Sequence, residues 1–230
     1  YEQGLPESEY GLPSGEFASI GIHESQSRLW ENHVGRSLAF WKFNFPFAKE
    51  KFPEAFKEIS ELKFYKAINK VKSSLIRTES DELTYHFHVR IRYEIEKMLI
   101  SGNLKTPDIP SFWNEQYKKW LDVDVPDDQH GCLQDVHWSH GSFGYFPTYS
   151  LGSFYAAQFF ACIERGDSQL KKKLEEGNTK DLLLWLRQRI HSSGRIWNSE
   201  EICKNATGET LNVQYFLDYL FDKYRKIYEF

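Results

Sequence analysis

Apolar positions recur at helical spacing along most of the chain. The pattern predicts a mainly α fold, a multi-helix single domain over residues 1–230 with a long irregular segment and little or no β structure. In "FPFAKEKFP", Pro46 and Pro53 are expected to interrupt the first helix, and Pro53 to begin the first of two short helical pieces. The remaining expected helices cover residues 16–43, 80–102 and 110–121, and lie near 153–165, 167–176, 179–191, 199–206 and 212–228.

Residues 80–102 fit two patterns. Alternate residues from Tyr85 to Ile95 are apolar or aromatic, as in a half-buried strand, but such a strand would be about twice the usual length. Ser80 or Asp81 could cap a helix and Gly102 could end it. We therefore expect a helix, whose apolar stripe is formed by Leu83, Phe87, Ile91, Ile95, Met98 and Leu99.

Residues 123–153 carry prolines and several glycines, which predicts a long irregular active-site loop, because long loops inside compact domains are usually functional. Its segment "GCLQDVHWSHGSFGYFPTYSLG" gathers Gln134, Asp135, His137, His140 and Tyr149. One alternative is a metal site on Asp135, His137 and His140, since Asp and His bind zinc. The simpler alternative is a loop held by polar side-chain hydrogen bonds.

The composition excludes several classes of protein. The net charge of −4 gives no sign of a nucleic-acid partner, and no apolar run approaches a membrane span. Three widely spaced cysteines, Cys132, Cys162 and Cys203, argue against a disulfide framework and favour a reducing, cytoplasmic location. His86 and His88 would point apart on a helix, so they are not expected to bind one metal ion together.

Two further stretches carry candidate chemistry. "GIHESQSRLWENHVGR" begins like a zincin helix, but H-E-x-x-H needs a second His where Ser27 stands. By itself, Glu24 is more simply a solvated charge at a helix start. In "SLIRTESDE", Arg77 could form an ion pair with Glu79 or Asp81, or clamp a carboxylate with two hydrogen bonds.

Taken together, these stretches resemble the family M32 metallocarboxypeptidases, the thermostable carboxypeptidase type. The matching motifs are "YEQGLP", "HESQSR", "IRTES", "GCLQDVHW", "GYFPTYSLGSFYAAQ" and "ATGE", in that order. Ser80 stands where that family usually has Ala. The resemblance covers nearly all of this chain but only the C-terminal portion, a little under half, of a family member.

The resemblance implies a zinc-dependent enzyme, with cobalt as a possible metal, that removes C-terminal amino acids from peptides with a free C-terminus. It implies Glu24 as a zinc ligand and His23 as its support, and the two His ligands and general-base Glu in a segment before Tyr1. Arg77 would recognise the terminal carboxylate. The remaining implied roles belong to His137 and Tyr149 as donors near the scissile bond, and to Gln134 and Asp135 as residues that orient His137.

For this chain by itself we expect no stably bound zinc and no significant peptidase activity, because one carboxylate does not make a zinc site. Its expected partners are the missing N-terminal half of the enzyme and, in the intact protein, a second copy in a homodimer. An uncovered apolar surface would favour self-association. The alternatives are a non-catalytic helical peptide-binding or interaction module, and a metal site rebuilt on His137 and His140.

Overall fold

The computed structural model describes all 230 residues and contains ten α-helices, several short 3-10 helices and no β-strand. The prediction of a mainly α, multi-helix fold is confirmed. The residues group into two compact units, one of residues 1–68 and 151–230 and one of residues 69–150. No helix combines the length and the apolar character that crossing a membrane requires.

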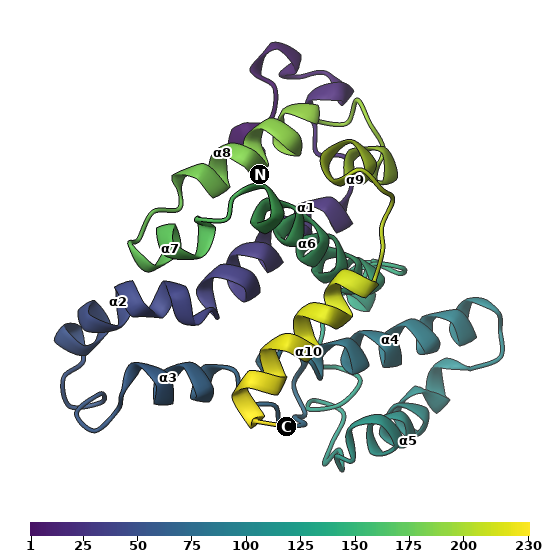
Figure 1. Cartoon of the computed structure of the whole chain (residues 1–230). Coiled ribbons are helices and arrows are strands. Elements are labelled where there is room, and N and C mark those ends of the chain that lie inside the picture. Colours follow the sequence, from purple (N-terminus) through teal and green to yellow (C-terminus); the bar gives the residue numbers. More distant parts are fainter. The chain divides into compact units, whose positions relative to one another are not determined.

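The first unit is built around a core of fully buried apolar side chains. Among these are Ile22, Phe159, Leu186 and Ile202, from four different helices. In Figure 1, α2 runs beside α7 and α8 lies near α9. The helices of this unit are α1 (Ile20–Arg28), α2 (Leu38–Lys51), α3 (Glu61–Ile68), most of α6 (Pro147–Gly166), α7 (Leu170–Glu175), α8 (Lys180–Arg189), α9 (Ser199–Thr207) and α10 (Gln214–Tyr228).

The prediction of one continuous helix over residues 16–43 is wrong. The segment contains α1, a π-helix over Leu29–Gly35, and the start of α2. Ser19 caps α1 by accepting from the backbone N–H of Ile22, and Ser37 caps α2 in the same way. A second capping serine thus starts a new helix inside a stretch whose apolar spacing is continuous.

The expected break at Pro46 is also wrong, because Pro46 lies inside α2. The ring of the neighbouring Phe45 is buried and lies 5.6 Å from the rings of both Phe56 and Phe64. This aromatic packing stabilises the helix past a proline that removes one backbone hydrogen bond. Pro53 does not begin a helix either: residues 53–58 form turns, residues 59–60 have no regular structure, and α3 is the only helix that follows before residue 77.

The second unit contains two long helices, α4 (Tyr85–Ile100) and α5 (Ile109–Leu121), which lie side by side (Figure 1). The expected helix over residues 80–102 is therefore confirmed. Asp81 accepts from the backbone N–H groups of Leu83 and Thr84 just before α4. Gly102 follows α4 with a φ of 76°, a conformation that glycine adopts readily. The core between the helices is formed by Ile91, Ile95, Trp113, Tyr117 and Leu121.

The irregular loop is shorter than predicted. It covers residues 122–146, because α6 begins at Pro147 rather than near residue 153. Tyr149 therefore lies in the first turn of a helix, where a proline at the first position fixes the backbone. The loop contains a 3-10 helix, Trp138–His140, and a second 3-10 helix, Arg77–Glu79, lies before α4.

Candidate functional site

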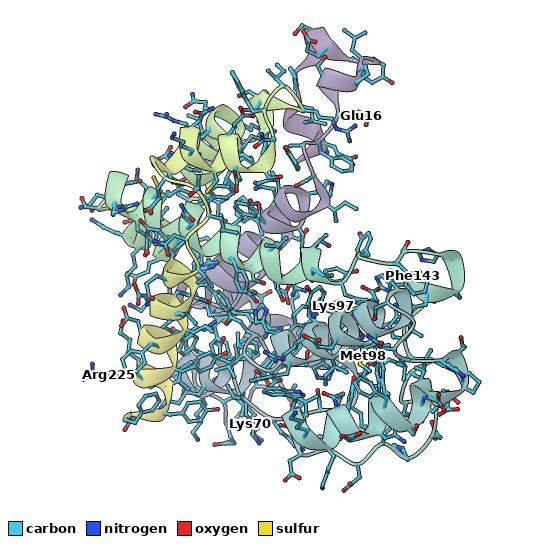
Figure 2. All side chains as sticks on the ribbon, turned by 90° about the vertical axis from the view of Figure 1, so that its right-hand side faces the viewer. Glu16, Lys70, Lys97, Met98, Phe143 and Arg225 are labelled. Carbon is cyan, nitrogen blue, oxygen red and sulfur yellow. The ribbon has the colours of Figure 1, made fainter.

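The loop of residues 122–146 is tied to α4 by Glu96. Its carboxylate accepts from Trp138 Nε1 at 2.8 Å and from the backbone N–H of Gly144 at 3.0 Å. Burial raises the pKa of Glu96, although these two hydrogen bonds act in the opposite direction. Figure 2 labels Lys97, which follows Glu96 on α4, and Phe143, which precedes Gly144 in the loop. The loop is therefore held to a helix.

One turn earlier on α4, Arg92 takes part in a cluster of two arginines and one carboxylate. Arg77 donates from Nε and Nη2 to Asp135 Oδ1, at 3.0 and 2.7 Å. Arg92 donates from Nε to Asp135 Oδ2 at 2.6 Å. Arg77 is 5% exposed and Arg92 0% exposed, so the cluster is largely removed from water. The ion pair of Arg77 is thus made with Asp135 rather than with Glu79 or Asp81.

Gln134 joins the same two arginines. Its Oε1 accepts from the backbone N–H of Arg77 at 2.9 Å and from Arg92 Nη2 at 2.8 Å. Its Nε2 donates to backbone carbonyls, the nearest that of His130 at 2.9 Å. Because both ends of the amide are engaged, Gln134 fixes the loop against the segment that carries Arg77.

The cluster carries a net positive charge. Burial by itself would raise the pKa of Asp135, but the charges of Arg92 and Arg77 and their hydrogen bonds hold that pKa below its usual value. Burial would lower the pKa of Arg77, and its bonds to Asp135 outweigh this and raise it. At neutral pH one carboxylate therefore faces two guanidinium groups.

Arg77 keeps hydrogen-bonding capacity beyond these contacts. Its Nη1 donates to Tyr85 Oη at 2.8 Å. Each terminal nitrogen carries a second N–H hydrogen that none of these bonds uses. The guanidinium carbon lies 4.8 Å from the ring centroid of Tyr149 and 5.5 Å from that of Phe146. Arg77 is thus a fixed, planar donor between aromatic rings, which suits bidentate binding of a carboxylate.

His137 lies beside this cluster and pairs with Tyr149. His137 Nε2 is 2.9 Å from Tyr149 Oη. His137 Nδ1 is 3.9 Å from Asp135 Oδ1, near the carboxylate but without a hydrogen bond. Burial lowers the pKa of His137, and the nearby Arg77 adds to this while Asp135 opposes it. His137 is therefore neutral at pH 7, and the pair can exchange donor and acceptor roles.

The structure gives Gln134 and Asp135 other contacts than the predicted ones. Both hold the arginines, and neither forms a hydrogen bond with His137. The roles of His137, Tyr149, Gln134 and Asp135 in a reaction stay predictions. What the structure adds is that these four residues and Arg77 lie within one compact unit.

The alternative metal site on Asp135, His137 and His140 finds no support in the geometry. Both oxygens of Asp135 accept from arginines, and His137 Nε2 faces a tyrosine. His140 Nδ1 lies 2.9 Å from Ser142 Oγ. Along the whole chain, no three His, Cys, Asp or Glu side chains come together in a group that could hold a metal ion.

Glu24 lies in the other unit, on α1. Its Oε1 is 3.0 Å from Nε of Arg28, one turn along the helix. Burial has the largest effect on the pKa of Glu24, and the net shift is upward. Arg28 lowers this pKa without reversing the shift, and the charge of Glu31 raises it further. Gly152 of α6 lies against this side chain, since a Cβ at Gly152 would be 2.6 Å from Glu24 Cγ. Glu24 is therefore positioned by a glycine contact and paired with an arginine that also pairs with Glu31.

The support of Glu24 by His23 stays a prediction. His23 Nε2 is 3.4 Å from Glu2, and the ring of His23 lies 5.0 Å from Phe17, with no hydrogen bond to Glu24. A buried contact that the sequence did not indicate lies on the same helix. Gln26 Oε1 is 2.9 Å from His191 Nε2, which holds α1 against the turn after α8.

The residues present do not form a complete metal centre. Glu24 is the one ligand that the resemblance assigns to this chain, and it is already paired with Arg28. A zinc site needs three or four protein ligands, so a single paired carboxylate is insufficient.

The sequence reasoning missed Arg92, Tyr85 and Glu96. Each is buried and contacts a predicted residue or the loop that carries several of them. A signal was present, because polar residues at positions 85, 88, 92 and 96 recur at helical spacing beside the apolar stripe of α4.

Comparison with known proteins agrees with these motifs. The family model for carboxypeptidase Taq (M32) metallopeptidase matches residues 1–224. The thermostable carboxypeptidase 1 of Thermus thermophilus is 45% identical over 99% of this chain. The carboxypeptidase 1 of Bacillus subtilis is 44% identical over 99% of this chain. The M32 carboxypeptidase structure from Deinococcus radiodurans superposes with a TM-score of 0.96 at 41% identity and covers 100% of this chain.

The chain spans less than half the length of these proteins: 44% of the Thermus enzyme, and 46% of both the Bacillus enzyme and the Deinococcus structure. The residues that the family model matches, 1–224, contain the loop and both arginines of the cluster. The chain belongs to the carboxypeptidase Taq (M32) metallopeptidase family.

Proposed function

We propose that this chain supplies the carboxylate-recognising part of a metal-dependent carboxypeptidase, an enzyme that removes C-terminal amino acids from peptides. The observation that supports this most is the arrangement of Arg77. Asp135, Tyr85 and Gln134 fix it, it lies in a cluster of net positive charge, and N–H hydrogens remain for a ligand. A peptidase that acts only at the C-terminus needs such a partner for the terminal carboxylate.

In this proposal, Arg77 binds the terminal carboxylate of the peptide with two parallel hydrogen bonds. His137 and Tyr149 form a neutral pair next to it, at 2.9 Å from each other. Either can donate to a peptide oxygen near the scissile bond. Tyr149 O–H is available when His137 Nε2–H donates to the phenol oxygen, and His137 Nδ1–H is available when Tyr149 O–H donates to Nε2. The aromatic rings around Arg77 exclude water and so strengthen its interaction with the carboxylate.

We propose Glu24 as one ligand of a zinc ion, with cobalt as the alternative, and the other ligands as residues outside this chain. Because no other residues of this chain complete the site, we propose that the chain alone hydrolyses no peptide. The N-terminal half of the enzyme and a second copy of it are the proposed partners. The three unpaired cysteines support a cytoplasmic location.

Calorimetric titration tests the carboxylate site. The chain is titrated with an acetylated dipeptide as the free acid and as the C-terminal amide. We expect binding of the acid to be at least tenfold tighter, about 1.4 kcal/mol, because the amide carries no negative charge. Arg77→Lys should abolish the preference, since lysine lacks the planar fork, while Arg90→Lys on the exposed side of α4 should keep it. Equal affinity for both peptides would contradict the proposal.

Zinc content and turnover test the proposal that the chain alone hydrolyses no peptide. The purified chain should carry far less than one equivalent of zinc and should not hydrolyse the free-acid dipeptide. One equivalent of zinc together with turnover would contradict this.

A non-catalytic peptide-binding module is the second candidate, favoured because the chain has a complete carboxylate cluster but an incomplete set of metal ligands. The coding sequence upstream distinguishes the two. An H-E-x-x-H motif in frame, ending three residues before Tyr1, supports the enzyme.

A further inference from the structure

Arg92 is a fully buried arginine that belongs to none of the motifs that carry the family resemblance. Its guanidinium donates to Asp135 Oδ2 at 2.6 Å, to Gln134 Oε1 at 2.8 Å and to the carbonyl of His88 at 2.9 Å. The group lies 4.5 Å from the ring centroid of Trp113. Because Arg92 is 0% exposed and fixed on every side, it cannot contact a substrate itself.

Two partners of Arg92 are also the two loop residues that hold Arg77. Asp135 binds the side chain of Arg77, and Gln134 accepts from its backbone N–H. Arg92 is therefore linked to Arg77 by two intermediates, the carboxylate of Asp135 and the side-chain amide of Gln134. A change in Arg92 would be passed to both the charge and the position of Arg77.

The charge balance shows what the second arginine contributes. Arg77 and Asp135 alone would form a neutral pair, so a substrate carboxylate would be attracted by one and repelled by the other at similar range. Arg92 occupies Oδ2 and adds a second positive charge. The cluster then keeps one net positive charge for an incoming anion.

We propose that Arg92 is a positioning residue that neutralises Asp135 and fixes it together with Gln134, so that the positive charge of Arg77 stays available and its guanidinium stays oriented for a peptide carboxylate. This inference rests on the proposed function of Arg77 and extends it to a residue that touches no substrate. In this proposal, Arg92 contributes to the preference of the site for a peptide with a free C-terminus over one with an amidated C-terminus.

The test compares Arg92→Met with the double variant Arg92→Met/Asp135→Asn, and uses Arg90→Met as a matched control. Arg90 lies on the same helix, is exposed and stacks on Trp120. Each variant of the 230-residue chain is titrated with the acetylated dipeptide acid and its amide, and its folding is checked by circular dichroism.

We expect Arg92→Met to weaken binding of the acid at least tenfold and to leave the amide unchanged within twofold. The double variant removes the uncompensated carboxylate, so it should fold and regain a preference for the acid of at least threefold. Arg90→Met should behave as the unmodified chain. If the role of Arg92 is purely structural, the double variant should show no greater preference for the acid than Arg92→Met does.

The outcomes separate the two proposals. The role of Arg92 is overturned, and that of Arg77 stands, if Arg77→Lys loses the preference for the acid while Arg92→Met keeps it. The same conclusion follows if the double variant regains no preference. If the unmodified chain shows no preference for the acid, both are overturned. If Arg92→Met does not fold, the double variant and Arg92→Lys decide: Arg92→Lys keeps the charge and should keep a preference of at least threefold.

Discussion

Asp135 binds Arg77 through a single oxygen: Nε and Nη2 of Arg77 both donate to Oδ1, at 3.0 and 2.7 Å. This leaves Oδ2 for Arg92, at 2.6 Å. One carboxylate therefore holds two buried cations, and each oxygen has its own partner. The stability of this unit should depend strongly on the charge of Asp135.

Asp135→Asn tests that dependence. The change leaves two buried guanidinium groups with no opposite charge, so the free energy of unfolding should fall by about 3–5 kcal/mol. Urea denaturation followed by circular dichroism measures it. Asp128→Asn, on the exposed part of the same loop, should change stability by no more than about 0.5 kcal/mol. Equal effects of the two changes would show that the ion pairs contribute little.

Glu96→Gln tests the anchor between the loop and α4. An amide can accept from either Trp138 Nε1 or the Gly144 N–H with its one oxygen, but its NH₂ group cannot accept from the other. The loss should be about 1–3 kcal/mol, and hydrogen exchange of the Gly144 amide should become faster. Glu94→Gln, which removes only an exposed pair with Lys97, is the control. Unchanged exchange at Gly144 would contradict the anchoring role.

Gly152→Ala tests the positioning of Glu24. The added methyl group would lie 2.6 Å from Glu24 Cγ and 3.0 Å from its backbone carbon, so the helices must separate or the side chain must move. We expect a loss of about 1–3 kcal/mol in the free energy of unfolding.

Gly166→Ala in the same helix is the control, because nothing lies within 4 Å of its Cβ position. That change should stabilise the helix slightly, by up to about 1 kcal/mol. If both substitutions stabilise the protein, the close contact at Gly152 is not present in solution.

Two buried histidines, His33 and His88, should make the protein less stable in acid. Burial lowers the pKa of each to about 3. At neutral pH both are uncharged in the folded and unfolded chains, so their titration does not lower the free energy of unfolding. Below the unfolded pKa of about 6.5 the unfolded chain takes up the protons, and stability falls by about 1.4 kcal/mol per histidine and pH unit until the folded pKa is reached.

Unfolding free energies at pH 7, 6, 5 and 4 measure this slope. His88→Gln should reduce it by about one proton's contribution, ~1.4 kcal/mol per pH unit. A stability that is flat between pH 7 and pH 4 would contradict the burial of these imidazoles.

The sequence predicted the class of fold and the motif residues, but not how the residues pair. The apolar stripe of α4 identified a helix where alternation suggested a strand. The polar stripe beside it, with Arg92 and Glu96, was not recognised, because a buried polar residue is stable only through partners from elsewhere in the chain. Those partners lie in the loop, and loop geometry does not follow from periodicity.

The errors in the fold have a similar cause. Pro46 was expected to end a helix, and the packing of Phe45 against Phe56 and Phe64 overrides that local preference. The π-helix of Leu29–Gly35 has the same apolar spacing as a regular helix over its short length. In both places, contacts made after folding decide the outcome.

Binding of a peptide's terminal carboxylate by Arg77 can be observed at the guanidinium itself. The most direct measurement is the NMR signal of the Arg77 Nε–H group, assigned by its loss in Arg77→Lys, during titration with the acetylated dipeptide acid and its amide. If Arg77 binds the carboxylate, this signal shifts with the acid and stays unchanged with the amide. A signal that responds to neither peptide, or equally to both, would contradict it.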